Sequence, residues 1–192
     1  MSTDFSPVDL ATARERLREL IKGLAVVRGK VTLASGIEAD YYVDLRRVTL
    51  HHEASRYVGQ VMLGLLDEAG IAFDAAGGLT MGADPVGNAI MRTAGDQGRT
   101  VDTFVVRKAQ KSYGMGRQVE GPSVVGRDVV VVEDTSTTGG SALTAVEALQ
   151  KAGANVVAAL REGERLGPGK TVVTLLCDSG LTYLSTDVYR SR

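Results

Sequence analysis

The sequence predicts an α/β fold in which helices flank a parallel β-sheet core. Short apolar runs rich in β-branched residues alternate along the chain with longer segments whose apolar residues recur at helical spacing. The run at 128–132 (DVVVV) is almost wholly apolar, as expected for a strand with both faces covered. Such alternation is typical of a parallel sheet wrapped by helices, and a length of 192 residues suits one domain.

The first expected helix begins near the amino terminus. Ser6 is a preferred N-cap residue, and Pro7 is favoured at the first helical position. Apolar residues then recur at helical spacing as far as Leu24. The mixed pattern at 31–48 predicts a short hairpin or strand pair. After it we expect a helix at 53–69 closed by Gly70, a strand at 73–77, a helix at 84–93 opened by Asp84 and Pro85, and a strand at 101–106.

The second half of the chain continues the alternation. Residues 107–121 are polar, basic and rich in glycine without periodicity, which predicts a loop. The apolar strand at 128–132 follows, and then a helix at 139–152 that Gly153 ends. Two further strands are expected at 156–160 and 171–177.

Composition excludes several classes of protein. The formal net charge is -1, so no overall field attracts nucleic acid or an anionic membrane. Cys177 is the one cysteine, which rules out an intrachain disulfide and a zinc site built on several thiolates. No apolar run reaches the roughly 18–20 residues of a membrane span, and the amino terminus lacks the apolar core of a signal peptide. We therefore expect a cytoplasmic protein that binds neither nucleic acid nor membrane.

The stretch VVVVEDTSTTGGSA at 129–142 carries the strongest chemical signal. Glu133 and Asp134 follow the apolar strand, at the sheet edge where α/β proteins bind ligands. The turn that comes next is rich in hydroxyls and glycine and leads into a helix, whose free N–H groups suit a phosphate. The two carboxylates would repel phosphate and suit sugar hydroxyls or a cation instead. A ribose 5-phosphate that carries Mg²⁺-bound phosphates offers all of these groups; an acidic strand end with an ordinary helix cap is the alternative.

This order of residues resembles the phosphoribosyl diphosphate (PRPP) motif of type I phosphoribosyltransferases. The resemblance implies that PRPP binds to Glu133, Asp134, Thr135, Ser136, Thr137, Thr138, Gly139, Gly140 and Ser141. A Walker-type phosphate loop is excluded. The nearest match, GERLGPGKT at 163–171, is one residue too long and is followed by an apolar run rather than a helix.

A basic segment, FVVRKAQKSYGMGRQVEG at 104–121, resembles the catalytic loop of orotate phosphoribosyltransferases. The resemblance implies a mobile lid whose cations Arg107, Lys108 and Lys111 meet a diphosphate leaving group while the lid excludes water. Tyr113 stands where that family usually has histidine, and the resemblance places it against PRPP as well. A solvated basic loop is the alternative.

Two more segments match the same family. VTLASGIEADYYVDLRRVTLHHEASR at 31–56 resembles the element that forms the orotate pocket. In it, Tyr42 and Val43 match positions that line the base, and Ala34 stands where many members carry lysine. GGLTMGADPVGNAI at 77–90 resembles the loop whose backbone amides touch the diphosphate, with Gly82 in place of a lysine found in many relatives.

The resemblance covers residues 20–157 and implies an orotate phosphoribosyltransferase with a Rossmann-like core and a small hood subdomain, to which residues 1–50 contribute. Such an enzyme transfers the 5-phosphoribosyl group from PRPP to orotate in pyrimidine biosynthesis. Members are usually homodimers that share the lid, and Mg²⁺ is expected as the cofactor, held through the diphosphate rather than mainly by protein. The expected catalytic residues are Lys108, Arg107, Lys111 and Asp134, and the expected orotate-binding residues are Tyr42, Val43, Thr137 and Arg161.

The tail at 153–192 departs from this pattern. The family continues with a strand that ends in aspartate-arginine, whereas the residues after Val157 look like the carboxyl end of cysteine synthases and cystathionine β-synthases. The tail lacks the catalytic lysine loop of those enzymes, so no pyridoxal phosphate is implied. We therefore hypothesise a recombined chain. A phosphoribosyltransferase of another base specificity, a PRPP-binding regulator and an inactive chimera stay open as alternatives.

Overall fold

The computed structural model describes residues 8–32, 38–109, 117–135 and 139–159. Its centre is a five-stranded sheet, in which the strands lie side by side in the order β5-β4-β3-β6-β7. The strands are β3 (Ala75–Leu79), β4 (Asp102–Val106), β5 (Val119–Glu120), β6 (Asp128–Val131) and β7 (Asn155–Ala159).

Four of these strands are parallel, as the sequence predicted. β3 pairs in parallel with both β4 and β6, and β6 pairs in parallel with β7. β5 runs antiparallel to β4, with Val105 opposite Glu120, so the sheet is mixed rather than wholly parallel. Strands that follow one another closely in the chain can pair antiparallel, whereas a parallel pair needs a longer crossover. The α/β fold class is confirmed, and the prediction of a loop throughout 107–121 was wrong at Val119 and Glu120.

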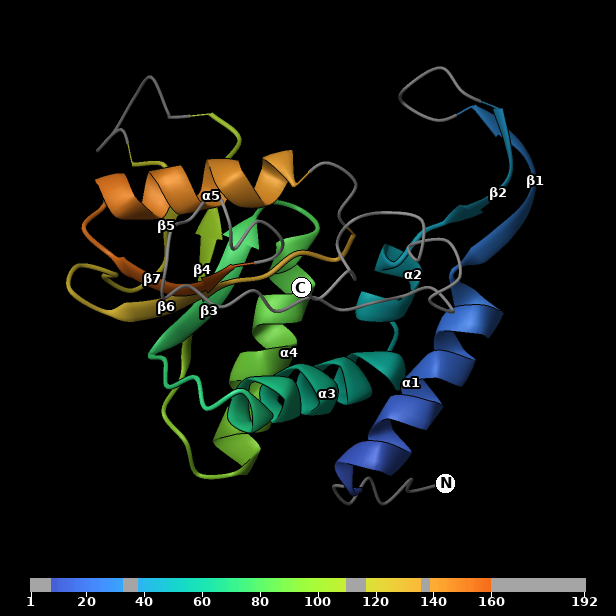
Figure 1. The fold of residues 1–192 in the computed structure, drawn as a ribbon, viewed down its shortest axis with the longest axis horizontal. Helices are drawn as coiled ribbons and strands as arrows, with labels where there is room; N and C mark the ends of the chain where they lie inside the picture. Colours follow the sequence, from blue (N-terminus) through green and yellow to red (C-terminus); the bar gives the residue numbers. More distant parts are fainter. Residues whose placement is uncertain (1–7, 33–37, 110–116, 136–138, 160–192) are drawn as a thin grey trace, which may run out of the picture.

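Helices cover both faces of this sheet (Figure 1). α5 (Gly140–Lys151) lies on one face, and α4 (Ala83–Asp96) lies on the other with α3 (Ala54–Glu68) packed against it. Each face has its own buried apolar cluster. Val130 belongs to the cluster on the α3–α4 side, while Val129 and Val131 belong to the cluster on the α5 side. Burial on both faces explains why β6 is apolar without the polar alternation of a half-exposed strand.

The amino-terminal helix α1 (Leu10–Leu24) packs against α3. Its N-cap is Asp9, whose side chain accepts a 3.0 Å hydrogen bond from the backbone N–H of Thr12. The predicted start at Ser6 and Pro7 was wrong, because Asp9 supplies the acceptor that the first turn needs. Ser6 and Pro7 themselves lie outside the described residues.

A separate two-stranded sheet follows α1. β1 (Val26–Thr32) and β2 (Glu38–Val43) pair antiparallel, with Val26 opposite Val43. Figure 1 shows both strands extending away from the five-stranded sheet. The hairpin predicted at 31–48 is confirmed in kind, but it begins earlier and is followed by a short helix, α2 (Arg46–Thr49). Leu45 and Val48 are buried in the core beside α3, which favours a helical turn over a longer β2.

Glycines end helices where the sequence predicted. Gly70 and Gly153 adopt φ angles of 65° and 83°, which glycine reaches without strain. Helix α4 begins at Ala83 rather than Asp84 and continues to Asp96. β7 confirms the strand expected at 156–160, and the strand expected at 171–177 lies outside the described residues. None of the helices within the described ranges has the length and apolar character needed to cross a bilayer.

Candidate active site

A cavity of about 310 Å³ opens where β3, β4 and β6 end. Parallel strands bring their carboxyl ends to one edge of a sheet, and α/β proteins bind ligands at that edge. The segment after β2 forms another wall of the cavity. The residues that line it are Tyr42, Asp44, Arg46, Leu79, Thr80, Met81, Gly82, Lys108, Glu133, Asp134, Thr135 and Ser141.

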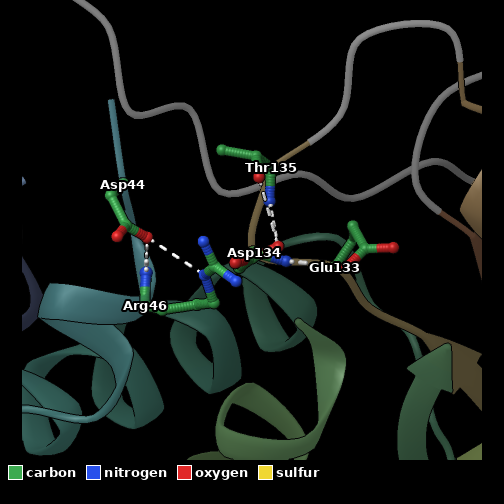
Figure 2. Close-up of polar contacts among 5 residues, drawn as sticks. All are labelled: Asp44, Arg46, Glu133, Asp134 and Thr135. Carbon is green, nitrogen blue, oxygen red and sulfur yellow. Dashed lines mark hydrogen bonds and ion pairs between the residues drawn. The ribbon is translucent and has the colours of Figure 1, made fainter. Parts of the chain in front are cut away.

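Glu133 and Asp134 form the acidic part of this wall. They come just after β6, and only 6% and 8% of their surfaces are exposed. The backbone N–H of Thr135 donates to Asp134 Oδ1 at 2.7 Å, and the backbone N–H of Asp134 donates to Glu133 Oε1 at 3.4 Å (Figure 2). These backbone N–H groups use one oxygen of each carboxyl group, Glu133 Oε1 and Asp134 Oδ1. Each group therefore has a second oxygen that the backbone does not engage and that a ligand can approach.

Burial raises the pKa of Glu133 to about 7, from an ordinary value of 4.5. The negative charge of Asp134, a side-chain hydrogen bond with Asp134 and the charge of Asp84 act in the same direction, while the hydrogen bond from the backbone N–H of Asp134 acts against them. A carboxyl group removed from water resists ionisation, and a neighbouring carboxylate adds to that resistance. Near neutral pH, Glu133 is therefore present in both protonated and ionised forms, and it can donate to a hydroxyl group or accept from one.

The turn from β3 into α4 lies against the acidic pair. Thr80 Oγ1 donates to Asp84 Oδ2 at 2.8 Å, which ties the turn to the first residues of α4. Asp84 is not the N-cap that its sequence context suggested, because Gly82 occupies that position. A Cβ atom at Gly82 would lie 2.5 Å from Glu133 Oε1 and would also overlap Asp134 Oδ1. Glycine leaves room for both carboxylates as they lie, which a lysine at this position would not.

Gly139 and Gly140 connect the turn after Asp134 to α5. Gly139 adopts a left-handed φ of 79° and immediately precedes Gly140, the first residue of α5. Thr135 and Ser141, on either side of the turn, both line the cavity. The first N–H groups of a helix are unpaired and carry partial positive charge, so this end of α5 suits a phosphate. The intervening residues, Ser136, Thr137 and Thr138, lie outside the described residues.

Of the basic residues predicted for the catalytic loop, Lys108 lines the cavity. The Arg107 guanidinium lies 3.5 Å from Glu120 Oε1, and the backbone N–H of Arg107 donates to the carbonyl of Gln118 at 2.9 Å. In this arrangement Arg107 joins β4 to β5 and is not one of the cavity residues. Lys111 and Tyr113 lie outside the described residues.

The orotate phosphoribosyltransferase of Streptomyces coelicolor is 61% identical to this chain over 149 residues, which are 78% of this chain and 81% of the relative. The chain belongs to the orotate phosphoribosyltransferase family. The orotate phosphoribosyltransferase of Corynebacterium glutamicum is 52% identical over 177 residues, 91% of each chain. No protein-family model matches the chain.

Solved orotate phosphoribosyltransferases share this fold. The crystal structure of the Mycobacterium tuberculosis H37Rv enzyme in complex with Fe(III) dicitrate has a TM-score of 0.73 and 50% identity, over 84% of this chain and 94% of that chain. The structure of the same enzyme in complex with PRPP has a TM-score of 0.69 and 46% identity, again over 84% of this chain and 94% of that chain. The predicted type I phosphoribosyltransferase fold is therefore confirmed.

The sequence similarity to orotate phosphoribosyltransferases extends beyond the residues that the structure describes. The Corynebacterium match covers 91% of this chain and so reaches into the tail at 153–192. The derivation of the tail from a cysteine synthase stays a hypothesis, and residues 160–192 lie outside the described structure.

On the hairpin side of the site, the resemblance to orotate phosphoribosyltransferases predicted contacts from Tyr42 and Val43. Tyr42 lines the cavity and is 38% exposed. The side chain of Val43 packs against the apolar core instead, so it would meet a base through its backbone. Thr137 and Arg161, the other residues predicted to bind orotate, lie outside the described residues.

Sequence reasoning missed two charged residues on this side of the site, Asp44 and Arg46. Arg46 Nε donates to Asp44 Oδ1 at 3.1 Å, and the backbone N–H of Arg46 reaches the same oxygen at 3.3 Å (Figure 2). The hydrogen bond to Asp44, and then the charge of Asp44, raise the pKa of the Arg46 guanidinium. Both residues lie shortly after Tyr42 and Val43, inside the segment already matched to the orotate pocket, and this nearness in sequence was the available signal.

Proposed function

We propose that the chain transfers the 5-phosphoribosyl group from PRPP to N1 of orotate and so gives orotidine 5′-monophosphate and diphosphate. The observation that supports this most is the buried pair Glu133 and Asp134 after β6, in one cavity with the start of α5 and with Lys108. That cavity combines carboxylate acceptors, a helix end suited to phosphate and a cation. PRPP presents the matching groups, which are ribose hydroxyls, a 5′-phosphate and a diphosphate.

In this proposal Glu133 and Asp134 accept hydrogen bonds from the ribose 2′- and 3′-hydroxyls. The transfer passes through a state of oxocarbenium character, in which positive charge develops at C1′ and nearby carboxylates stabilise it. The 5′-phosphate binds along the turn that leads into α5, whose residues are Thr135, Ser136, Thr137, Thr138, Gly139, Gly140 and Ser141. The protein then contributes position and charge rather than a covalent intermediate.

The departing diphosphate is proposed to meet Lys108, together with Arg107, Lys111 and Tyr113. Arg107 would exchange Glu120 for the diphosphate, at little cost because both side chains of that ion pair are 40% exposed. Mg²⁺ would arrive with PRPP and neutralise charge on the diphosphate. The described residues contain no group of three His, Cys, Asp or Glu side chains placed for a metal ion, and Mg²⁺ commonly keeps water and substrate phosphate as ligands.

Orotate is proposed to lie on the hairpin side of the cavity, against Tyr42 and Val43, with Thr137 and Arg161 as further contacts.

Residues 1–50 would contribute a hood over the site. The proposed assembly is a homodimer in which each subunit lends its catalytic loop to the other, in the cytoplasm and without nucleic-acid or membrane partners. The β1–β2 hairpin supports the hood assignment, because it forms a sheet separate from the five-stranded one and its strand β2 carries Tyr42, which lines the cavity.

The tail at 153–192 is proposed to complete the domain, whatever its origin. The resemblance of residues after Val157 to cysteine synthases supports recombination, and the long Corynebacterium match supports an ordinary orotate phosphoribosyltransferase ending. Removal of residues 160–192 distinguishes a recombined tail from a native ending. A native ending is needed for the fold, so truncation would lower the melting temperature, whereas a foreign appendage could be removed without that loss.

The test of the function is orotate consumption, followed by absorbance in the presence of PRPP and Mg²⁺. The wild-type chain should turn over, and a Glu133→Ala/Asp134→Ala variant should lose activity. Glu147→Ala, an exposed glutamate on α5, is the matched control and should retain activity. Turnover that survives in the double variant would contradict the assigned roles, and turnover with adenine or uracil in place of orotate would reassign the acceptor.

A further inference from the structure

Electrostatic repulsion opposes the binding of an anionic acceptor in this cavity. Orotate carries a carboxylate on the ring carbon beside the nitrogen that attacks C1′, so the reaction brings this anion deep into the site. In the described part of the chain, three acidic side chains already line the cavity, those of Asp44, Glu133 and Asp134. An anion that enters such a site needs a cation on its own side, since like charges at close range are costly.

Among the residues that the structure describes, two cationic side chains line the cavity, those of Lys108 and Arg46. Lys108 follows β4, whose residue Val106 pairs with Leu79 at the end of β3. Lys108 therefore belongs to the side of the cavity formed by the β3–α4 turn. Arg46 begins α2, a few residues after Tyr42, and belongs to the hairpin side. The two cations thus stand on different walls and can serve different anions, the diphosphate and the acceptor.

Asp44 holds the guanidinium of Arg46 in place but leaves hydrogen-bond donors of that group available. Its Nε atom is engaged with Asp44, and Figure 2 shows the group lying between Asp44 and Asp134. Within the described residues, neither terminal nitrogen of Arg46 takes part in a hydrogen bond. A planar guanidinium with two free donors matches a carboxylate, which can accept both in parallel.

The ion pair itself does little for the fold. The side chains of Arg46 and Asp44 are 48% and 25% exposed, and pairs of this kind contribute little to stability because water already solvates the charges. Arg47, the next residue, is exposed as well but does not line the cavity. A role in binding explains why Arg46 is oriented into the cavity, whereas a stabilising role would not require that direction.

We propose that Arg46 binds the carboxylate of the acceptor and thereby selects orotate over pyrimidines that lack this group. Asp44 positions the guanidinium through Nε. The inference rests on the proposed transfer from PRPP to orotate and adds the residue that determines acceptor specificity.

The experiment compares Arg46→Gln with the matched control Arg47→Gln. Charged hydrogen bonds to a carboxylate predict that Arg46→Gln raises the KM for orotate roughly 10- to 100-fold, while the KM for PRPP stays within about twofold. The preference for orotate over uracil, measured as a ratio of kcat/KM values, should fall by a similar factor. Arg47→Gln should match the wild type in all three, and the melting temperature of both variants should stay close to that of the wild type.

Four results would overturn the inference. An unchanged KM for orotate would remove Arg46 from the acceptor site. A rise confined to the KM for PRPP would assign Arg46 to phosphate instead, and a matching loss of thermal stability would make its role structural. Orotate binding measured by calorimetry with PRPP present separates this question from catalysis. Binding by the wild type that Arg46→Gln abolishes supports the inference even without turnover, whereas a wild type that neither binds orotate nor turns it over overturns both proposals.

Discussion

Gly82 lies against the carboxylate of Asp134, with no room for a Cβ atom between them. The backbone angles of Gly82 are right-handed and helical, with φ −68° and ψ −41°, so alanine could adopt them without strain. The carboxylates of Asp134 and Glu133 are the atoms that would have to move. A side chain at position 82 should therefore disturb the ligand site and leave the fold intact.

The substitution Gly82→Ala tests this relationship. We expect kcat/KM for PRPP to fall by at least about tenfold, because displaced carboxylates no longer meet the ribose hydroxyls, while the melting temperature stays nearly unchanged. Gly95→Ala, in the same helix but with open space around its Cβ position, is the control. It should retain activity and add up to about 1 kcal/mol of stability. Equal activity of the two variants would show that the carboxylates can shift freely.

Of the described basic residues in the segment matched to a catalytic loop, Lys108 lines the cavity, and we expect it to act on the leaving group. Lys108→Ala should lower kcat by roughly 10²- to 10³-fold, as is typical when one group that stabilises transition-state charge is lost. The KM for PRPP should change much less, because the diphosphate bears its extra charge only as the bond breaks. Lys151→Ala, on the exposed last turn of α5, serves as the comparison. If Lys108→Ala retained the wild-type kcat, Lys108 would have no role in the chemical step.

The raised pKa of Glu133 predicts a dependence of stability on pH. The folded protein holds the Glu133 proton up to a pKa of about 7, whereas the unfolded chain releases it near 4.5. Between these values the folded state binds more protons, so this residue makes stability fall as pH rises, and its unfavourable effect is complete above about pH 7. The substitution Glu133→Gln removes the ionisation and therefore this loss.

Thermal and chemical unfolding of Glu133→Gln should accordingly show a gain on the order of 1–3 kcal/mol over the wild type at about pH 8, and little gain at about pH 4.5. The same variant should bind PRPP less well, which is the usual conflict between stability and function at an active site. Glu147→Gln should follow the wild-type profile at both pH values. A stability difference that did not depend on pH would assign the effect to packing rather than ionisation.

Gly59 marks the close packing of α3 on α4. A Cβ atom there would overlap the backbone carbonyl of Ala89 and the hydroxyl of Thr93. Because a carbonyl in a helix cannot turn aside, Gly59→Ala should force the two helices apart and cost roughly 1–3 kcal/mol, read as a lower denaturation midpoint. Gly23→Ala, near the end of α1 with nothing close to its Cβ position, should be neutral or stabilising. A stable Gly59→Ala variant would contradict the packing described here.

The parts of this structure that the sequence predicted are those with local causes. The run of valines, the adjacent acids and the glycine turn are consecutive, so strand, acidic pair and helix start could be placed without knowledge of the rest of the chain. Gly70 and Gly153 were likewise recognisable, because a left-handed angle at a helix end favours glycine whatever surrounds it.

The features that were missed depend on contacts between distant segments. Arg107 faces Glu120 only because β5 returns beside β4, and no periodicity marks a strand as short as Val119–Glu120. Arg46 enters the site because α2 turns the chain back after β2, an effect of burying Leu45 and Val48. The exclusion of a side chain at Gly82 follows from the position of a carboxylate about fifty residues later.

The strand order β5-β4-β3-β6-β7 has a consequence for how activity is acquired during folding. β3 lies between β4 and β6, although β6 follows β4 in the chain, so the cavity assembles only when segments far apart in sequence have met. Closing such long loops is slow compared with forming helices. In a refolding experiment, helical signal should therefore recover before the ability to bind substrate. Recovery of substrate binding, rather than of helical signal, therefore reports when β3 has paired with both β4 and β6.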